Sequence, residues 1–216
     1  MLTEFITSWP SASFIIKGAV VTLKYSILAV FFGLIIGIFL ALFKMSRHFA
    51  LRTFAHVYTS IFRGTPVLIQ LSIIYFGMPS FIDIKLNIFT AGVLTFSLNS
   101  GAYVSEIIRA GIEAVDKGQF DAARALGIPQ SLMMKDIILP QAIRTILPSL
   151  INELINLIKE SAIISMIGEM DIMRRAQMVS AETYNFFVPM CIAATTYYFL
   201  VLVISYLSRI LEKKLA

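Results

Sequence analysis

The feature that most limits how this chain can fold is a set of long apolar runs without a charged side chain. Residues 25–43, 64–82, 86–105 and 183–208 contain no Asp, Glu, Lys or Arg. Each run is close to the roughly 20 residues that an α-helix needs to cross the hydrocarbon core of a bilayer. Because a backbone in lipid must satisfy its own hydrogen bonds, such runs form helices. The sequence therefore predicts an all-α integral membrane protein.

The composition argues against a soluble domain. Hydrophobic residues make up 58% of the chain and charged residues 14%, whereas a soluble domain carries about 25% charged residues. The net charge is +5, but the basic residues are scattered between apolar runs rather than gathered in one patch, so we expect no nucleic-acid partner. The single cysteine, Cys191, excludes an internal disulfide.

Five membrane-spanning helices are expected, and residues 1–216 are treated as one domain. Four are the apolar runs. The remaining one, fourth along the chain, covers 146 to about 168 and is interrupted by Glu153, Lys159 and Glu160. A mixed lead-in is expected at residues 1–22, a basic connection at 44–63, and polar connections at about 110–141 and 169–182.

Two short patterns lie within these spans. Gly33 and Gly37 are four residues apart, a spacing that permits close approach of a second helix, although glycine is also simply tolerated in membrane helices. Thr65-Pro66 lies at the start of the second span, where proline removes a backbone donor. It marks either the first turn of that span, or a kink that exposes carbonyl groups to a pathway.

The distribution of basic residues predicts the orientation. Five spans place the termini on opposite sides, and the more basic side is cytoplasmic. With the C-terminus inside, twelve Lys and Arg residues are cytoplasmic and five are external. We therefore expect the N-terminus outside and the C-terminus in the cytoplasm. Arg174 and Arg175 are then external, and they fit either a docking surface for another protein or a solvated face.

This orientation makes the main polar interruption, residues 110–141, a cytoplasmic loop. Gln119–Leu126 and Ser131–Ile138 are each predicted to form a short helix, and Pro140 is predicted to end the second. Asp121 is expected near the positive N-terminal end of the first helix. The alanines of that helix offer a low-profile surface that fits a groove on another protein. An ordinary connector between two spans is the alternative.

The spacing within this loop resembles a known motif. Asp121-Ala122-Ala123, with Gly127, Ile137 and Leu139-Pro140 after it, resembles the cytoplasmic coupling motif of the membrane subunits of ATP-binding-cassette (ABC) importers, which have Glu in place of Asp121. Further motifs follow the order seen in the permeases of polar amino-acid importers, which serve histidine, glutamine, glutamate, arginine or cystine. They are Arg63-Gly64-Thr65-Pro66, Gly101-Ala102-Tyr103 with Glu106 and Arg109, Gly118-Gln119, Leu139-Pro140-Gln141-Ala142 and Lys159-Glu160-Ser161.

The resemblance implies the type I ABC importer permease fold, in the inner membrane of a bacterium. It assigns coupling to the ATPase to Asp121, Ala122, Ala123, Gly127, Leu139 and Pro140. The implied partners are two cytoplasmic ATPase subunits that hold ATP and Mg²⁺, a second permease copy and an external amino-acid-binding protein. The chain has no Gly-Lys dipeptide and hence no phosphate-binding loop, so we expect no cofactor and no ATP hydrolysis on it. A secondary transporter or channel that needs no ATPase is the rival class.

Polar residues of the third and fourth spans fall on narrow arcs. At about 100° per helical residue, an arc of about 120° holds Ser149, Asn152, Glu153, Asn156, Lys159 and Glu160. An arc of about 80° holds Thr95, Asn99, Tyr103 and Glu106. Ionisable groups at membrane depth cost at least about 2.5 kcal/mol each, so they face a cavity or one another. We predict two facing polar stripes, with substrate contacts from Asn99, Tyr103, Glu153, Asn156, Lys159, Glu160 and Ser161.

The charges of the fourth span suggest the cargo. Lys159 suits the α-carboxylate of an amino acid, and Glu153 or Glu160 suits an ammonium or a cationic side chain. The resemblance does not demand a charge at Glu153, which favours a basic amino acid such as arginine, lysine or histidine over glutamine, glutamate or cystine. The structural alternatives are a Lys159–Glu160 pair and a Glu153 packed at a subunit interface. Polar stripes sufficient for a site on one chain favour a homodimer.

Overall fold

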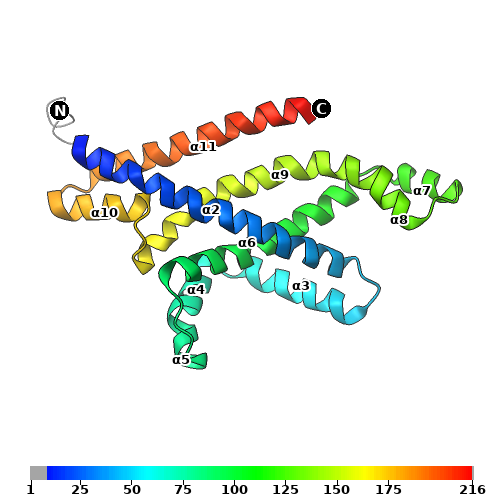
Figure 1. Ribbon diagram of the computed structural model, residues 1–216, viewed down its shortest axis with the longest axis horizontal. Helices are drawn as coiled ribbons and strands as arrows, with labels where there is room; N and C mark the ends of the chain where they lie inside the picture. The colour runs from blue at the N-terminus through cyan, green and yellow to red at the C-terminus, as the bar shows by residue number, and fades with distance from the viewer. Residues whose placement is uncertain (1–8, 216) are drawn as a thin grey trace.

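The computed structural model describes residues 9–215, and these residues are helical apart from short connections (Figure 1). The elements are α2 (Trp9–Lys44), α3 (Phe49–Gly64), α4 (Val67–Ser72), η1 (Ile73–Gly77), α5 (Met78–Ile82), α6 (Ile88–Glu113), α7 (Lys117–Ala125), α8 (Gln130–Leu132), η2 (Met133–Ile138), α9 (Leu139–Glu160), η3 (Ser161–Ile167), α10 (Ile172–Thr183) and α11 (Phe187–Leu215). Elements η1 and η2 are π-helical turns, and η3 is a 3₁₀ helix. No strand occurs between residues 9 and 215, which confirms the all-α prediction.

The first helix, α2, is longer than the predicted span. It begins at Trp9 and includes most of the expected lead-in, of which residues 1–8 lie outside the described range. Lys17 and Lys24 lie within this helix, and both side chains are exposed on its surface. The ammonium of Lys24 also lies 4.2 Å from the centre of the Phe89 ring.

Helix α2 packs along α6 at very short range (Figure 1). A Cβ atom on Gly33 would lie 2.8 Å from the Ser100 side chain, and one on Gly37 would lie 2.5 Å from the Val104 side chain. Gly101 of α6 meets α2 in the same way. Only glycine fits at this separation, so the predicted close approach at Gly33 and Gly37 is confirmed.

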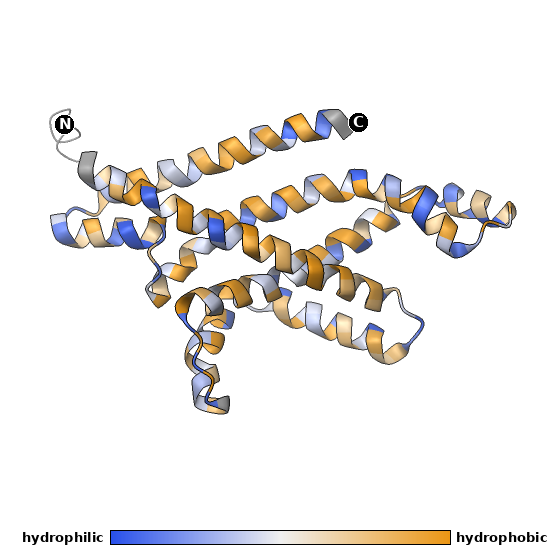
Figure 2. Cartoon of the chain, viewed as in Figure 1, coloured by the Kyte–Doolittle hydropathy of each residue, from blue (hydrophilic) through white to orange (hydrophobic). Residues whose placement is uncertain are grey.

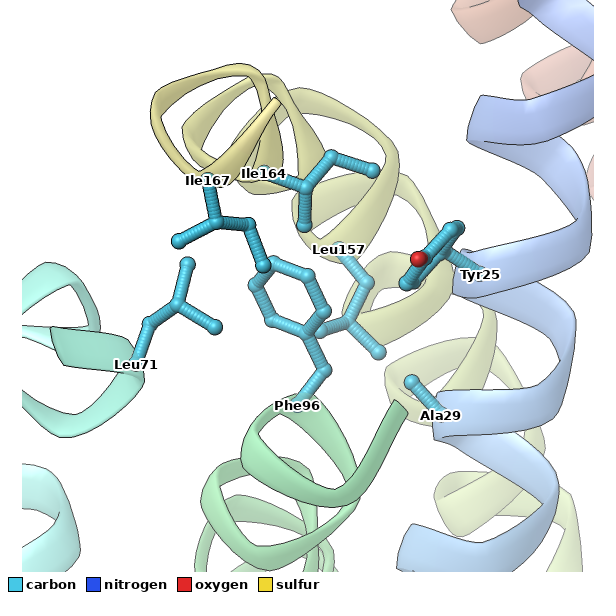
Figure 3. Close-up of a cluster of buried hydrophobic side chains, with 7 residues drawn as sticks. All are labelled: Tyr25, Ala29, Leu71, Phe96, Leu157, Ile164 and Ile167. Atoms are coloured by element: carbon cyan, nitrogen blue, oxygen red, sulfur yellow. The ribbon is translucent and has the colours of Figure 1, made fainter. Parts of the chain in front are cut away.

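The main apolar core lies where α2, α4, α6, α9 and η3 meet (Figure 3). Its buried side chains are Tyr25, Ala29, Leu71, Phe96, Leu157, Ile164 and Ile167. The hydroxyl of Tyr25 reaches past this cluster and donates to the carboxylate of Glu169. Apolar residues continue along α2 and α11 (Figure 2), and many of their side chains are exposed in the single chain, as expected for surfaces that meet lipid or another subunit.

The prediction of a basic connection before the second span was wrong. Residues 49–64 form the helix α3, which meets the helical segment Val67–Phe81 at an angle of 102°. Charges were read as loop markers, but the apolar residues of α3 recur at helical spacing along one exposed side, namely Phe49, Phe54, Val57 and Ile61. Pro66 precedes the first residue of α4, so Thr65-Pro66 marks the break between the two helices.

The loop between α6 and α9 contains one separate helix rather than two. The first predicted helix forms as α7, but α8, η2 and α9 follow without a break from Gln130 to Glu160, so Pro140 does not end the second. Pro140 is tolerated because it lies in the first turn of α9, directly after the widened turn η2. A buried apolar cluster holds α7 against the ends of α6 and α9, and it consists of Ile112, Val115, Ala123, Met133, Ile138, Ala142 and Ile146.

The number of spans is settled only in part by the helices. Among the described residues, Ser11–Lys44 and Phe187–Lys213 are long and apolar enough to cross a membrane, and the bent pair of α3 with the segment after it counts as a third if it is one span. Helices α6 and α9 are about 39 and 33 Å long. The turn after α2, the helix α7 and the end of α11 lie towards one end of the molecule, and α10 lies at the other (Figure 1). The count of five and the orientation stay predictions.

Candidate transport pathway and coupling surface

Most polar residues of the predicted fourth span lie on the open side of α9. Asn152, Asn156, Lys159 and Glu160 are exposed in the single chain. Asn156 lies four residues after Asn152, three before Lys159 and four before Glu160, and these spacings place the four residues on one side of the helix. We refer to these four residues as the polar face of α9. Among the ion pairs of residues 9–215, none joins Lys159 to Glu160.

Two of the predicted substrate residues lie behind this face. Glu153 is 7% exposed, and its carboxyl lies beside the buried hydroxyl of Ser100 on α6 and within electrostatic reach of Glu160. The hydroxyl of Ser161 is also buried and donates to the carbonyl of Ile158 at 2.8 Å. Both side chains are buried behind the polar face of α9. A direct contact with substrate stays a prediction for each.

The polar stripe of α6 does not face the polar face of α9 within this chain. Its arc is turned towards α2, α3 and α4 instead. Tyr103 lies beside the guanidinium of Arg63, whose central carbon is 5.3 Å from the ring centre. Glu106 pairs with Lys44 of α2 at 2.6 Å. A helical arc is defined only relative to its own axis, so the sequence could not show which neighbour it meets.

Asn99, the third member of that stripe, supports the break between α3 and α4. Pro66 has no N–H, so the carbonyl of Phe62 lacks its usual helical donor. The side-chain nitrogen of Asn99 donates to this carbonyl at 3.1 Å and to Oε1 of Gln70 at 3.0 Å. Nε2 of Gln70 donates to the same carbonyl at 2.9 Å. Asn99 therefore has a structural role, and its predicted contact with substrate stays a prediction.

Sequence reasoning missed two residues that organise this region. The sequence could have indicated the role of Gln70. Pro66 leaves the carbonyl of Phe62 without a helical donor, and Gln70, one turn after Pro66, carries a side-chain amide that can donate to it. Lys44 was assigned to a connection, but its side chain is 1% exposed. No local pattern indicates its burial, because its partner Glu106 is 62 residues away.

The predicted coupling residues lie on α7, in the turn directly after it and in the first turn of α9, at one end of the molecule (Figure 1). Asp121 and Ala122 are exposed, whereas Ala123 is buried in the apolar cluster. Asp121 is the fifth residue of α7, so the prediction that it lies near the N-terminus was wrong, because the helix starts at Lys117. Its carboxylate pairs with Arg124 at 3.3 Å.

Both ends of α7 are closed by local hydrogen bonds. Asp116 caps the first turn by accepting from the Gly118 N–H at 2.6 Å. At the other end, Gly127 has a φ of +68°, and the N–H of Ile128 reaches back to the carbonyl of Ala123 at 3.0 Å. This is a Schellman motif, which requires a left-handed residue and so favours glycine. The motif makes α7 a short and well-defined protrusion.

The remaining coupling residues are also accessible. Leu139 and Pro140 are exposed on the first turn of α9, and Leu126 is 78% exposed at the end of α7. The exposed residues of α7 and the first turn of α9 are referred to below as the coupling surface.

At the opposite end of the molecule, Asp171 joins α10 to α11. It is fully buried, accepts from the Arg174 N–H at 2.8 Å and accepts from the hydroxyl of Tyr197 on α11 at 3.1 Å. Burial raises the pKa of Asp171 to about 6, although both hydrogen bonds oppose the rise. Arg175 donates to the carbonyl of Phe14 at 3.2 Å, so this arginine links α10 to α2.

The groups on α9 are suited to reversible binding rather than to making bonds. The polar face of α9 offers an ammonium, a carboxylate and two amides, which together match a zwitterion. Between residues 9 and 215, no group of three or more His, Cys, Asp or Glu side chains is arranged to hold a metal ion.

Known proteins are similar to this chain over its whole length. A family described as "Binding-protein-dependent transport system inner membrane component" matches residues 33–216. The putative glutamine transport system permease protein GlnP of Rickettsia felis is 64% identical over 215 residues, covering 100% of this chain and 99% of the relative. The arginine transport system permease protein ArtQ of Bacillus subtilis is 49% identical over 215 residues, with coverages of 100% and 98%.

A solved structure shows the same fold. The crystal structure of an amino acid ABC transporter with histidines matches with a TM-score of 0.92 and 43% identity, covering 99% of this chain and 98% of that one. The predicted type I permease fold is thereby confirmed, as is the resemblance that was based on the coupling motif. The chain therefore belongs to the family of binding-protein-dependent transport system inner membrane components, as a permease subunit of an amino-acid ABC importer.

Proposed function

We propose that this chain and a second permease subunit enclose a pathway for a polar amino acid between their α9 helices. The observation that carries this proposal is the polar face of α9, which is exposed in the single chain. Charged groups at membrane depth are costly in lipid and therefore face a water-filled cavity or another subunit. A second permease placed against α9 would cover this face and leave its polar groups lining a shared pathway.

The polar face of α9 provides a partner for each polar part of a free amino acid. The ammonium of Lys159 suits the α-carboxylate, and the carboxylate of Glu160 suits the α-ammonium. The amides of Asn152 and Asn156 each offer a donor and an acceptor, which match a side-chain amide. The same chain supplies groups of both charges, which supports a homodimer over a heterodimer.

The position of Glu153 bears on the cargo. The sequence favoured a basic amino acid because Glu153 adds a second carboxylate to the site. Its burial behind the polar face favours a neutral amide cargo instead, because the carboxyl is less available to a cationic side chain. We therefore place glutamine first, in keeping with the relative from Rickettsia felis. Arginine is the second candidate, supported by the arginine permease of Bacillus subtilis and by the nearness of Glu153 to Glu160.

Energy reaches this pathway through the coupling surface. Two ATPase subunits hold ATP and Mg²⁺ on the cytoplasmic side. Each of them binds the coupling surface of one permease subunit. An external amino-acid-binding protein delivers the cargo to the other side of the bacterial inner membrane, where the N-terminus lies. ATP binding closes the ATPase pair and shifts the pathway from inward- to outward-facing. Separation of the ATPase pair after hydrolysis returns the pathway to the inward-facing state. This chain supplies the groups that bind the amino acid, and it alternates between the inward- and outward-facing conformations.

The test is ATP-driven uptake by the purified complex. The permease is purified with the ATPase that accompanies it, reconstituted into proteoliposomes with its binding protein, and given radiolabelled L-glutamine with or without an excess of unlabelled L-arginine. We expect ATP-dependent uptake of glutamine that arginine inhibits weakly. Uptake that needs no ATP, or purification without any ATPase, would contradict the proposal and favour a secondary transporter or channel.

A tag-exchange experiment tests the homodimer. Two copies of this chain, one with a Flag tag and one with a His tag, are expressed together with the ATPase. We expect each tag to recover the other copy in one complex. Recovery of only one tag together with a different permease would show a heterodimer.

A further inference from the structure

The C-terminal end of α2 is tied to α6 by a buried ion pair. Nζ of Lys44, the last residue of α2, lies 2.6 Å from Oε1 of Glu106 and donates to Oγ of Ser105 at 2.8 Å. The side chain of Lys44 is 1% exposed and that of Glu106 is 22% exposed. A buried ammonium is strongly destabilised if its counter-charge is removed, so the end of α2 is held at this point of α6, about two turns before α6 ends.

The same carboxylate continues a chain of charges towards the coupling helix. Nε and Nη2 of Arg109 donate to Oε2 of Glu106 at 3.0 and 2.8 Å. Nη1 of Arg109 donates to Glu113, the last residue of α6, at 2.5 Å. The cap of α7, Asp116, follows three residues later. Glu106 therefore stands between Lys44 of α2 and the residues that lead into α7.

Helix α7 is in turn fixed to α6 by apolar contacts. Ala123 of α7 is buried together with Ile112, in the last turn of α6, and Val115, just beyond the end of α6. A displacement of α7 is therefore passed to the end of α6, because packed side chains do not compress. The glycine contacts near Gly33 and Gly37 set how closely α2 and α6 approach. The ion pair sets the position of the C-terminal end of α2 along the length of α6.

We propose that Lys44 and Glu106 are positioning residues that make α2 move as one body with α6 when the ATPase subunits displace α7. This inference rests on the proposed function of the coupling surface. The moving unit of the permease then includes the first span, which contributes no residue to the coupling surface and none to the polar face of α9. Without the pair, the end of α6 follows α7 while α2 stays behind, and ATP hydrolysis is no longer converted into opening of the pathway.

Distances measured by pulsed electron paramagnetic resonance test this directly. In the complete complex with the Cys191→Ser background, spin labels replace the exposed residues Met45, after α2, and Ala110, on α6. We expect the same distance without nucleotide and with ATP plus vanadate in the otherwise wild-type permease. In the Glu106→Gln variant we expect the distance to differ between the two states. A wild-type distance that changes, or a Glu106→Gln distance that does not, overturns the inference.

A second label pair separates this inference from the proposed function. Labels at Gln119 on α7 and Leu211 on α11, both exposed, report whether α7 moves at all. If this distance is the same in both nucleotide states, the proposed role of the coupling surface fails, and the inference fails with it. If it changes while the first pair in the wild type changes too, only the inference about Lys44 and Glu106 is overturned.

Matched variants distinguish positioning from simple stability. Glu113→Gln removes the outer pair of Arg109, is 62% exposed and leaves the buried pair intact, so it should behave as the wild type. Lys44→Met should raise the number of ATP molecules hydrolysed per glutamine imported about tenfold, within the usual range of coupling between two sites. Lys44→Arg should restore most of the loss. A purely structural pair would lower both activities together and leave this ratio unchanged, which would overturn the inference.

Discussion

The side-chain nitrogen of Asn99 on α6 donates to the side-chain oxygen of Gln70 on α4 at 3.0 Å, and both amides also donate to the carbonyl of Phe62. The two residues are 29 positions apart in the chain. Together they replace the backbone hydrogen bond that Pro66 cannot make, and they hold the 102° bend between α3 and the segment after it.

Removal of the Gln70 amide should therefore destabilise the permease. Gln70→Leu removes one of the two acceptors of the buried Asn99 amide, and one of the two side-chain donors to the carbonyl of Phe62. An unsatisfied buried polar group costs about 1–3 kcal/mol, so we expect a loss of that size in the free energy of unfolding. Denaturant unfolding of the purified complex measures it.

The matched control is Gln141→Leu. Gln141 is exposed on α9 and donates to the carbonyl of Ile137 in its own helix at 2.8 Å. We expect a change within about 0.5 kcal/mol, as for most surface substitutions. Equal losses for the two variants would contradict a specific role for Gln70.

The close contact of α2 with α6 predicts a difference between two glycines. A Cβ atom on Gly37 would lie 2.5 Å from the Val104 side chain, whereas one on Gly64 has no neighbour within 4 Å. Gly37→Ala should lower the free energy of unfolding by about 1–3 kcal/mol, the usual cost of overpacking. Gly64→Ala should cause no loss. Thermal unfolding followed by size-exclusion chromatography compares them, and equal stability would show that the helices separate easily.

The left-handed conformation of Gly127 predicts a graded effect on coupling. An L-residue in this conformation costs about 1–2 kcal/mol, and proline is restricted to a φ near −65°. Gly127→Ala should reduce uptake moderately, and Gly127→Pro should uncouple ATP hydrolysis from uptake, because the end of α7 is rebuilt. Uptake and ATPase rate are measured on the same proteoliposomes. Normal uptake by a correctly inserted Gly127→Pro variant would count heavily against the role of the coupling surface.

The cargo can be read from the charge of Glu153. If arginine is carried, Glu153→Gln should raise the KM for arginine about tenfold or more, the equivalent of 1.4 kcal/mol, while glutamine uptake is little affected. If glutamine is the main cargo, its uptake should persist in this variant. Glu182→Gln, on an exposed position of α10, is the control. An equal loss for both amino acids would rule out charge matching at Glu153.

Asp171 predicts a dependence of stability on pH. It lies between the predicted fourth and fifth spans, and burial raises its pKa from 3.8 to about 6. Between these values the folded state holds a proton that the unfolded state has lost, so stability falls as the pH rises from about 4 to about 6. The difference corresponds to about 3 kcal/mol.

The test of this dependence is the variant Asp171→Asn. An asparagine retains the cap of α10 and an acceptor for Tyr197, but it does not titrate. Thermal unfolding from pH 4 to pH 7 should show a smaller decline for Asp171→Asn than for the wild type, and Asp121→Asn, on the exposed coupling surface, should behave as the wild type. Parallel curves for all three proteins would contradict the prediction.

Much of the fold and part of the site followed from local pattern. The apolar runs predicted the membrane helices because burial in lipid is decided by composition over about 20 residues. The spacing Asp121 to Pro140 indicated the family, and Gly33 and Gly37 indicated a close helix contact. Charges were a poorer guide: Arg52 and Arg63 were read as markers of a loop, although both lie in the amphipathic helix α3.

The sequence by itself determined the class of protein and the family, because each depends on composition or on spacing along one stretch of chain. Only the tertiary structure decided that Asn99 supports a break, that Glu153 lies behind the polar face of α9 and that Lys44 is buried against Glu106. Each of these depends on which helices lie side by side. Periodicity defines a face relative to its own helix axis, and packing between distant segments decides what that face meets.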